Sequence, residues 1–134
     1  MPVRLYAHLS WTTFGRLPLI DSTTADFLRT FLPAQSQRHG SRVLALGIVR
    51  DHVHLILELP PAFDVPRLVQ GLKGASARIA NRDGIARHES LRWAQGYDFR
   101  SVGPRQLRAA VEYVRGQALH HPDRALPEAH ATSK

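Results

Sequence analysis

The sequence predicts an α+β domain in which helices pack on the faces of an antiparallel sheet, the plan of ferredoxin-like domains. Three observations lead to this prediction. Strand-like and helix-like periodicities follow one another in the order β, α, β, β, α, β, α. Only two residues separate the second and third strand-like runs, so these two runs should form an antiparallel hairpin. The chain has 134 residues, enough for one buried core and too few for two ordinary domains.

Four strand-like segments are predicted from apolar patterning. Apolar and polar residues alternate over residues 4–14, the period of a strand with one buried face. Residues 42–49 and 52–59 are the two apolar runs of the hairpin. Residues 91–101 are short, aromatic and interrupted by Gly96, which predicts one or two brief strands.

Three helices are predicted from capping residues and apolar stripes. The first begins near Thr24, and Pro33 should kink it or end its first part. Asp64 should cap the second helix, and the third should run from near Pro104 to Pro122. The expected buried faces are Val65, Leu68, Val69, Leu72, Ala75 and Ile79 in the second helix and Leu107, Ala110, Val111, Val114 and Ala118 in the third.

The composition is that of a globular protein, with 43% hydrophobic and 22% charged residues. We therefore expect one domain over residues 1–122 and a loosely ordered tail over residues 123–134. No stretch is apolar for the roughly 18 residues that a membrane helix needs. Residues 1–10 lack the pattern of a signal peptide, so we expect a cytoplasmic protein.

Charge and cysteine content narrow the chemistry. The chain has no cysteine, which excludes disulfides and thiolate ligands, so a metal ion would need histidine, carboxylate or amide ligands. Eighteen basic residues against 11 acidic ones give a net charge of +7, and all but two of the basic residues are arginine. This excess favours a nucleic-acid partner, although a GC-rich genome would also enrich arginine.

Two histidines begin the third strand. Because side chains alternate across a sheet, His52 and His54 should point to one face while Val53 and Leu55 point to the other. Same-face neighbours lie about 6 to 7 Å apart, close enough for both rings to bind one metal ion. The alternative is a pair of exposed or locally hydrogen-bonded histidines. Asp51 could orient one imidazole, but we favour a role as a turn residue.

Tyr113 and Gln117 lie four residues apart in the third helix and therefore on one side of it. A tyrosine at the edge of an apolar stripe is often only an amphipathic packing residue. As a nucleophile, a phenol with a pKa near 10 needs a nearby cation to stabilise its oxyanion. Two histidines and an amide oxygen could hold that cation.

The segments DHVHL at residues 51–55 and EYVRGQ at residues 112–117 together resemble the single-tyrosine HUH transposases, including the REP-associated tyrosine transposases. Supporting motifs lie in residues 11–20, 68–78 and 93–102, so the resemblance covers most of the chain. The resemblance implies the HUH-endonuclease version of the predicted fold. It also implies that His52, His54 and Gln117 bind Mg²⁺ or Mn²⁺ and that Tyr113 is the nucleophile.

The same resemblance implies an activity and partners. Members of this family cut single-stranded DNA beside folded hairpins, form a 5′-phosphotyrosine link and rejoin strands by the reverse attack. They work as homodimers, and in several the tyrosine helix completes the partner's active site.

The DNA-contacting residues are less clearly indicated. In the family, a basic residue usually follows the threonine of the first strand, whereas here Thr13 follows Thr12 and the nearest cation is Arg16. Trp93 and Tyr97 could stack on bases or belong to the core. The candidate phosphate contacts are Arg16, Lys73, Arg78, Arg82, Arg100 and Arg105.

Two other functions are compatible with parts of this pattern. A non-enzymatic DNA-binding protein descended from such an enzyme would keep the basic surface without the chemistry. A metal-dependent hydrolase would activate water and use Tyr113 only for packing, but no carboxylate-rich cluster surrounds His52 in the sequence.

Overall fold

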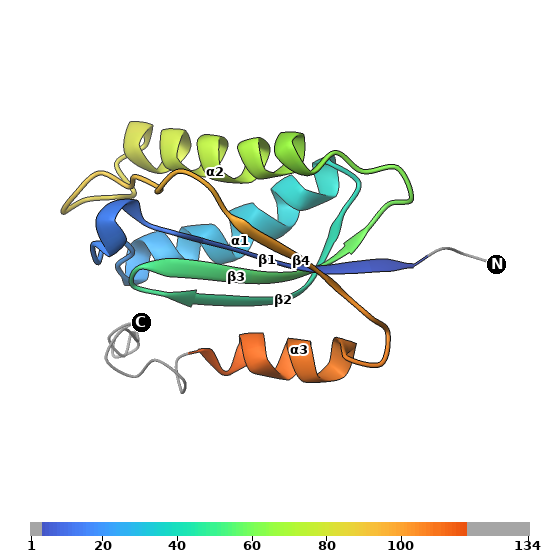
Figure 1. The fold of residues 1–134 in the computed structure, drawn as a ribbon. Helices are drawn as coiled ribbons and strands as arrows, with labels where there is room; N and C mark the ends of the chain where they lie inside the picture. Colours follow the sequence, from blue (N-terminus) through green and yellow to red (C-terminus); the bar gives the residue numbers. More distant parts are fainter. Residues whose placement is uncertain (1–3, 118–134) are drawn as a thin grey trace.

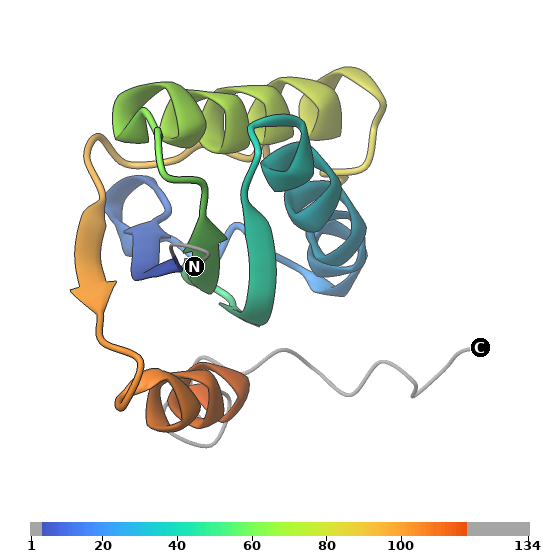
Figure 2. The same cartoon turned by 90° about the vertical axis from the view of Figure 1, so that its right-hand side faces the viewer.

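Four strands form one antiparallel sheet in the order β2-β3-β1-β4, seen in a computed structural model that describes residues 4–117. Helices α1 and α2 cover one face of the sheet, and α3 lies against the other (Figures 1 and 2). The arrangement confirms the predicted α+β, ferredoxin-like fold and the predicted order of elements. The elements are β1 (Leu5–Thr12), a short 3-10 helix η1 (Phe14–Arg16), α1 (Ser22–Arg38), β2 (Arg42–Val49), β3 (His52–Leu59), α2 (Val65–Arg82), β4 (Asp98–Val102) and α3 (Leu107–Arg115).

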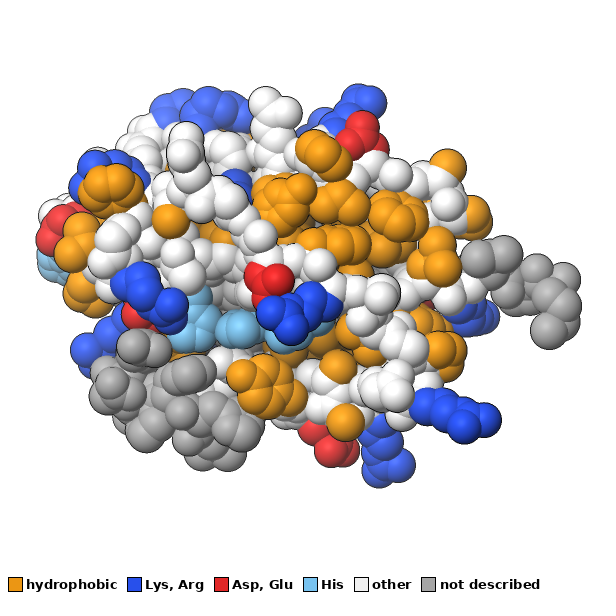
Figure 3. Space-filling view, in the orientation of Figure 1, with side chains coloured by type: hydrophobic (Ala, Val, Ile, Leu, Met, Phe, Trp, Pro, Cys, Tyr) orange, Lys and Arg blue, Asp and Glu red, His pale blue; other side chains and the backbone are white. Residues whose placement is uncertain are grey.

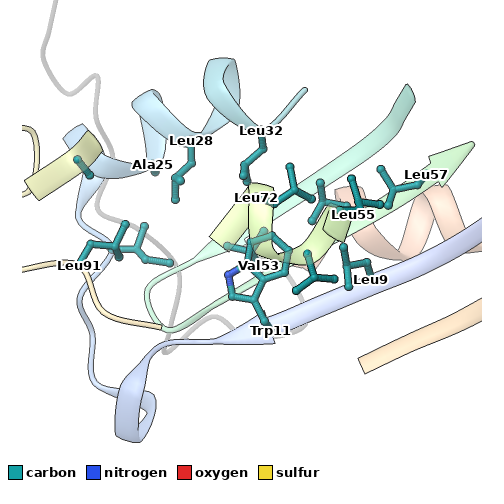
Figure 4. Packing of buried hydrophobic residues seen from close by; sticks show 14 of the residues in the cluster. Leu9, Trp11, Ala25, Leu28, Leu32, Val53, Leu55, Leu57, Leu72 and Leu91 are labelled. Carbon is teal, nitrogen blue, oxygen red and sulfur yellow. The ribbon is translucent and has the colours of Figure 1, made fainter. Parts of the chain in front are cut away.

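The main core lies between the sheet and helices α1 and α2 (Figure 4). Alternate residues of β1 and β3 point into it, and the helices contribute leucines from the opposite side. Full burial of each such side chain contributes about 1.5–3 kcal/mol, which makes this half of the molecule a rigid support. Its fully buried members include Leu9, Val53, Leu55, Leu57, Leu28, Leu32 and Leu72.

A second, smaller apolar cluster holds α3 on the other face of the sheet. Ala45 of β2, Ile56 of β3 and Val114 of α3 form its buried centre. Leu107, Ala110 and Val111 are partly buried against it, as the predicted stripe of the third helix requires. Since His52 and His54 share a strand face with Ile56, this packing places α3 beside the histidine pair.

The first two helices begin at aspartate caps. The Asp64 carboxylate accepts a hydrogen bond from the Arg67 amide at 3.1 Å, which confirms the predicted cap of α2. Asp21 caps α1 in the same way, so this helix begins at Ser22, two residues before the predicted start at Thr24.

We expected Pro33 to kink the first helix or to end its first part; it lies within α1, which continues to Arg38, so it does not end the helix. A proline removes one helical hydrogen bond. Leu28, Leu32 and Ser36 are nevertheless fully buried on both sides of it, and their packing against the core favours a continuous helix.

The buried stripe of α2 also departs from prediction in its second half. It continues through Ser76 and Ala80, whereas Ala75 and Ile79 are only partly buried. The Ser76 hydroxyl accepts a hydrogen bond from the indole nitrogen of Trp93 at 3.0 Å. A polar residue therefore occupies the buried face because it has a specific partner, which an apolar pattern does not reveal.

The segment before α3 contains one strand, β4, rather than two. Trp93 forms only an isolated bridge with Thr13, and Gly96 then takes a positive φ of 86° before β4 begins. The ammonium group of Lys73 donates hydrogen bonds to the carbonyl oxygens of Ala94 and Gly96, both at 2.7 Å, and so fastens this loop to α2.

Helix α3 ends at Arg115, and Gly116 forms a turn before Gln117. The predicted continuation to Pro122, including Ala118, and the predicted tail at 123–134 lie outside the described residues. Within residues 4–117, no helix is both long and apolar enough to cross a membrane.

Candidate active site

His52 and His54 lie on the α3-facing side of β3, which confirms the face predicted from strand alternation. Their ring centroids are 4.9 Å apart, and the His52 side chain is almost fully buried. Val53 and Leu55 point into the main core on the opposite face. The strand that carries the histidine pair is therefore fixed by core packing on its opposite face.

Asp51 both belongs to the β2–β3 turn and orients a histidine. Its Oδ1 lies 2.7 Å from Nδ1 of His52 and its carboxylate is buried. The turn role that we favoured is thus only part of its function. An imidazole whose Nδ1–H donates to a carboxylate keeps its Nε2 as the atom available to a metal ion.

Arg16 joins this arrangement from η1. Its Nε lies 3.7 Å from Oδ2 of Asp51, and about half of its side chain remains exposed. The backbone of Arg16 has a φ of 54°, a left-handed conformation that costs a non-glycine residue about 1–3 kcal/mol. This strained turn places the guanidinium group at the end of β1 where the histidines lie.

His8 is a third histidine of the site, and the sequence analysis did not identify it. Its Nε2 lies 2.8 Å from Nδ1 of His54. Burial lowers the pKa of His8, an effect opposed by the Asp98 carboxylate and increased by the Arg100 guanidinium. Strand alternation placed His8 on the polar face of β1, but only the pairing of β1 with β3 brings it to His54.

Tyr113 lies beside this cluster on α3. Its ring centroid is 6.2 Å from that of His54 and 6.3 Å from that of His8, and the side chain is 42% exposed. The predicted nucleophile therefore lies near the predicted metal ligand His54 of the same chain, and the Tyr113 side chain is partly exposed to solvent.

Gln117 is buried one helical turn beyond Tyr113. Its Nε2 donates a long hydrogen bond of 3.4 Å to the Tyr113 carbonyl. Its Oε1 is buried without a hydrogen-bond partner among residues 4–117. An unsatisfied buried amide oxygen costs about 1–3 kcal/mol, so this atom fits the role of a metal ligand.

Gly47 allows α3 to lie close to the histidines. It is the register partner of His54 on β2, so both residues lie on the same face of the sheet. A Cβ at position 47 would lie 2.4 Å from the Val114 carbonyl oxygen and 3.0 Å from Cγ of Gln117. The missing side chain thus leaves the space that Gln117 occupies.

The histidine pair opens into a hollow of about 230 Å³. Figure 3 shows histidine side chains gathered on this surface with basic side chains beside them. A larger hollow of about 470 Å³ lies between α1 and the start of α2, where it includes neither member of the histidine pair. The smaller hollow is therefore the candidate site, and it is lined by Ser10, Trp11, Thr12, Arg16, His52, His54 and Tyr113.

The donor set is consistent with a divalent cation bound by nitrogen and oxygen. Among residues 4–117, no three His, Cys, Asp or Glu side chains are grouped to hold a metal ion. The buried Gln117 oxygen is a possible ligand of another type beside His52 and His54. Mixed nitrogen and oxygen ligands suit Mn²⁺ at least as well as Mg²⁺.

The candidate DNA contacts do not all lie at this hollow. Arg16 lines it, and Arg100 on β4 is the register partner of His8. The Lys73 ammonium is engaged with the loop carbonyls, and burial lowers its pKa. The other three candidates do not line the hollow: Arg78 and Arg82 lie on α2, and Arg105 lies in the turn before α3.

Comparison with known proteins identifies the family. Residues 2–117 match the family described as Transposase IS200 like. The chain belongs to the IS200-like transposase family. The match covers every element that carries a candidate site residue, from His8 of β1 to Gln117 after α3.

Individual relatives agree with this assignment of an IS200-like transposase. The ISDra2 transposase TnpA of Deinococcus radiodurans is 36% identical over 75 residues, which are 56% of this chain and 54% of that protein. The match thus spans about half the length of this curated relative. A crystal structure of a candidate transposase from Deinococcus radiodurans superposes with a TM-score of 0.68 and 25% identity, covering 95% of both chains.

A second solved structure shares the fold of this IS200-like transposase. It is a REP-associated tyrosine transposase bound to a REP hairpin, with a TM-score of 0.70, 14% identity, and coverage of 90% of this chain and 71% of that one. The predicted family resemblance and fold are confirmed. The roles of the individual site residues stay predictions.

The packing at Gly47 can be tested by a single methyl group. We expect Gly47→Ala to lower the free energy of unfolding by about 1–3 kcal/mol, because the added Cβ would meet a backbone oxygen. Gly74→Ala is the matched control: no atom lies within 4 Å of its added Cβ, and alanine in an exposed helix should stabilise by about 0.5–1 kcal/mol. Urea denaturation measures both, and equal stability of Gly47→Ala and wild type would refute the close packing.

Proposed function

We propose that this IS200-like transposase is a metal-dependent enzyme that cleaves and rejoins single-stranded DNA through a 5′-phosphotyrosine intermediate. One observation carries the proposal. The exposed ring of Tyr113 lies about 6 Å from that of His54, while the buried Gln117 oxygen has no partner in the described part of the chain. The proposed nucleophile and the proposed metal ligands thus lie on the same side of the sheet.

His52 and His54, through their Nε2 atoms, and Gln117, through Oε1, would hold Mg²⁺ or Mn²⁺. A bound divalent cation would polarise the scissile phosphate and stabilise the phenolate. Asp51 contributes by fixing the ring of His52, and the buried scaffold behind β3 keeps both rings in place.

Tyr113 would act by nucleophilic attack. Its Oη forms a bond to phosphorus while the bond from phosphorus to O3′ breaks. The phenol loses a proton to water, and O3′ takes one up, so the products are a 5′-phosphotyrosine and a free 3′-hydroxyl. Because the new bond preserves the phosphoester, a 3′-hydroxyl can attack it in reverse and rejoin the strands without another energy source.

The position of Tyr113 supports an active site built within one chain. Its ring contacts those of His8 and His54 of the same chain. We propose that the enzyme is a homodimer, as the resemblance implies, in which each Tyr113 can serve its own metal site.

The DNA partner is proposed from charge and from similarity. Arg16 lines the hollow and would contact the phosphate beside the cleaved bond, and the net charge of +7 favours a polyanion. The REP-associated tyrosine transposase of similar fold is bound to a REP hairpin. We therefore propose that this enzyme acts on hairpin-bearing single-stranded DNA, such as REP-like or element-end DNA, in the cytoplasm.

Replacement of Tyr113 tests the covalent step. We expect wild-type protein, incubated with Mn²⁺ and hairpin-bearing single-stranded DNA from the region flanking its gene, to form a covalent complex on a denaturing gel. Tyr113→Phe should form none, because it lacks the nucleophilic oxygen. Tyr97→Phe is the matched control, since Tyr97 is 41% exposed, close to the 42% of Tyr113, and should keep the complex.

Other outcomes would favour other functions. Cleavage that persists in Tyr113→Phe would support a hydrolase that activates water. Binding of the flanking DNA without cleavage by wild type would support a non-catalytic DNA-binding protein.

Replacement of Gln117 separates metal binding from folding. Gln117→Leu should weaken Mn²⁺ binding by at least about 10-fold, because one ligand is lost. It should leave the stability of the metal-free protein unchanged or higher, because a buried oxygen without a described partner is removed. Titration calorimetry with Mn²⁺ and urea denaturation measure the two effects. Unchanged Mn²⁺ affinity would exclude Gln117 as a ligand.

A further inference from the structure

We propose that His8 is a positioning residue that accepts a hydrogen bond from Nδ1 of His54 and so holds His54 with its Nε2 available to the metal ion. The inference rests on the proposed function and adds to it a residue that acts through a ligand. His8 is the third histidine on this face of the sheet, contributed by β1.

The distance between the two rings restricts where the protons can be. Nε2 of His8 and Nδ1 of His54 are 2.8 Å apart, with ring centroids at 5.0 Å and ring planes inclined by 38°. At this distance one nitrogen must donate and the other accept, because two lone pairs or two N–H groups would repel each other.

Only one of the two arrangements is compatible with metal binding. If His8 donated, neutral His54 would carry its proton on Nε2 and could not offer that atom to a cation. If His54 donates through Nδ1–H, its Nε2 keeps a lone pair. A metal site on His54 Nε2 therefore requires His8 to be the acceptor.

The two predicted ligands would then be oriented in the same way from different parts of the fold. His52 has its Nδ1 at the Asp51 carboxylate, supplied by the preceding turn. His54 has its Nδ1 at His8, supplied by the neighbouring strand. The register pairs Ser10 with His54, so His8 reaches it diagonally from two residues along the same face of β1.

A histidine has an advantage over a carboxylate at this position. The ring of His8 lies 6.3 Å from that of Tyr113, where the scissile phosphate and the phenolate would carry negative charge. A neutral imidazole accepts the hydrogen bond without adding a further negative charge, which would repel both groups. Asp51 can be a carboxylate because Arg16 lies beside it.

The protonation of His54 can be measured directly in the metal-free protein. Long-range ¹H–¹⁵N correlation spectra of the ¹⁵N-labelled full chain, recorded at mildly alkaline pH where imidazoles are neutral, report which ring nitrogen carries the proton. His54→Gln assigns the signals by their loss. We expect the proton on Nδ1 of His54 in wild type and in His8→Gln, whose amide oxygen can accept, and a shift towards Nε2 in His8→Leu.

Metal affinity provides the second measurement. His8→Leu should weaken Mn²⁺ binding about 10- to 100-fold, and His8→Gln should recover most of the loss. His88→Leu, a change of an exposed histidine after α2, is the matched control and should bind Mn²⁺ as wild type does.

Two results would overturn the inference. One is a wild-type His54 protonated on Nε2, which the wild-type spectrum shows once the His54 signals are assigned. The other is a folded His8→Leu with the tautomer and Mn²⁺ affinity of wild type. Since the spectra need neither metal nor DNA, a protein that keeps the His54 tautomer but fails to cleave would contradict the proposed function and not the role of His8.

Discussion

The close approach of α3 to the sheet at Gly47 is the constraint on which the site depends. The histidines belong to β3, whereas Tyr113 and Gln117 belong to a helix that contacts β2 and β3 through a small apolar cluster. With no side chain at position 47, the Val114 carbonyl and the Gln117 side chain lie directly against the strand beside His54. Strand β3 and helix α3 thereby bring the proposed metal ligands and the proposed nucleophile together on one face of the sheet.

One face of the sheet packs the main core, and the opposite face carries the candidate site. The period-two pattern of β3 sends Val53 and Leu55 into the main core and sends His52 and His54 to the opposite face. Core packing fixes β3, and hydrogen bonds at Nδ1 of His52 and Nδ1 of His54 orient the two rings. A metal site that is oriented before metal and DNA bind loses less entropy when they arrive.

Local patterns predicted most of the fold and the shared sides on which His52, His54, Tyr113 and Gln117 lie, because strand alternation and helical spacing depend only on neighbouring positions. The predicted roles of these four residues came from the family resemblance. Residues whose role depends on strand order could not be found in this way. His8 reaches His54 only because β1 lies beside β3, and Gly47 matters only because α3 crosses its strand. Asp51 was assigned to the turn because the sequence does not show which carboxylate contacts His52. Pro33 was expected to kink α1 or end its first part, but a local rule cannot weigh the tertiary packing that favours continuation of the helix past it.

Anomalous diffraction from crystals grown with Mn²⁺ tests the central claim most directly. The account predicts one strong manganese peak per chain, at a bonding distance of about 2 Å from Nε2 of His52, Nε2 of His54 and Oε1 of Gln117, with Tyr113 of the same chain beside it. A peak that lacks the Gln117 oxygen, or a manganese ion bound elsewhere while the histidine pair is empty, would contradict it.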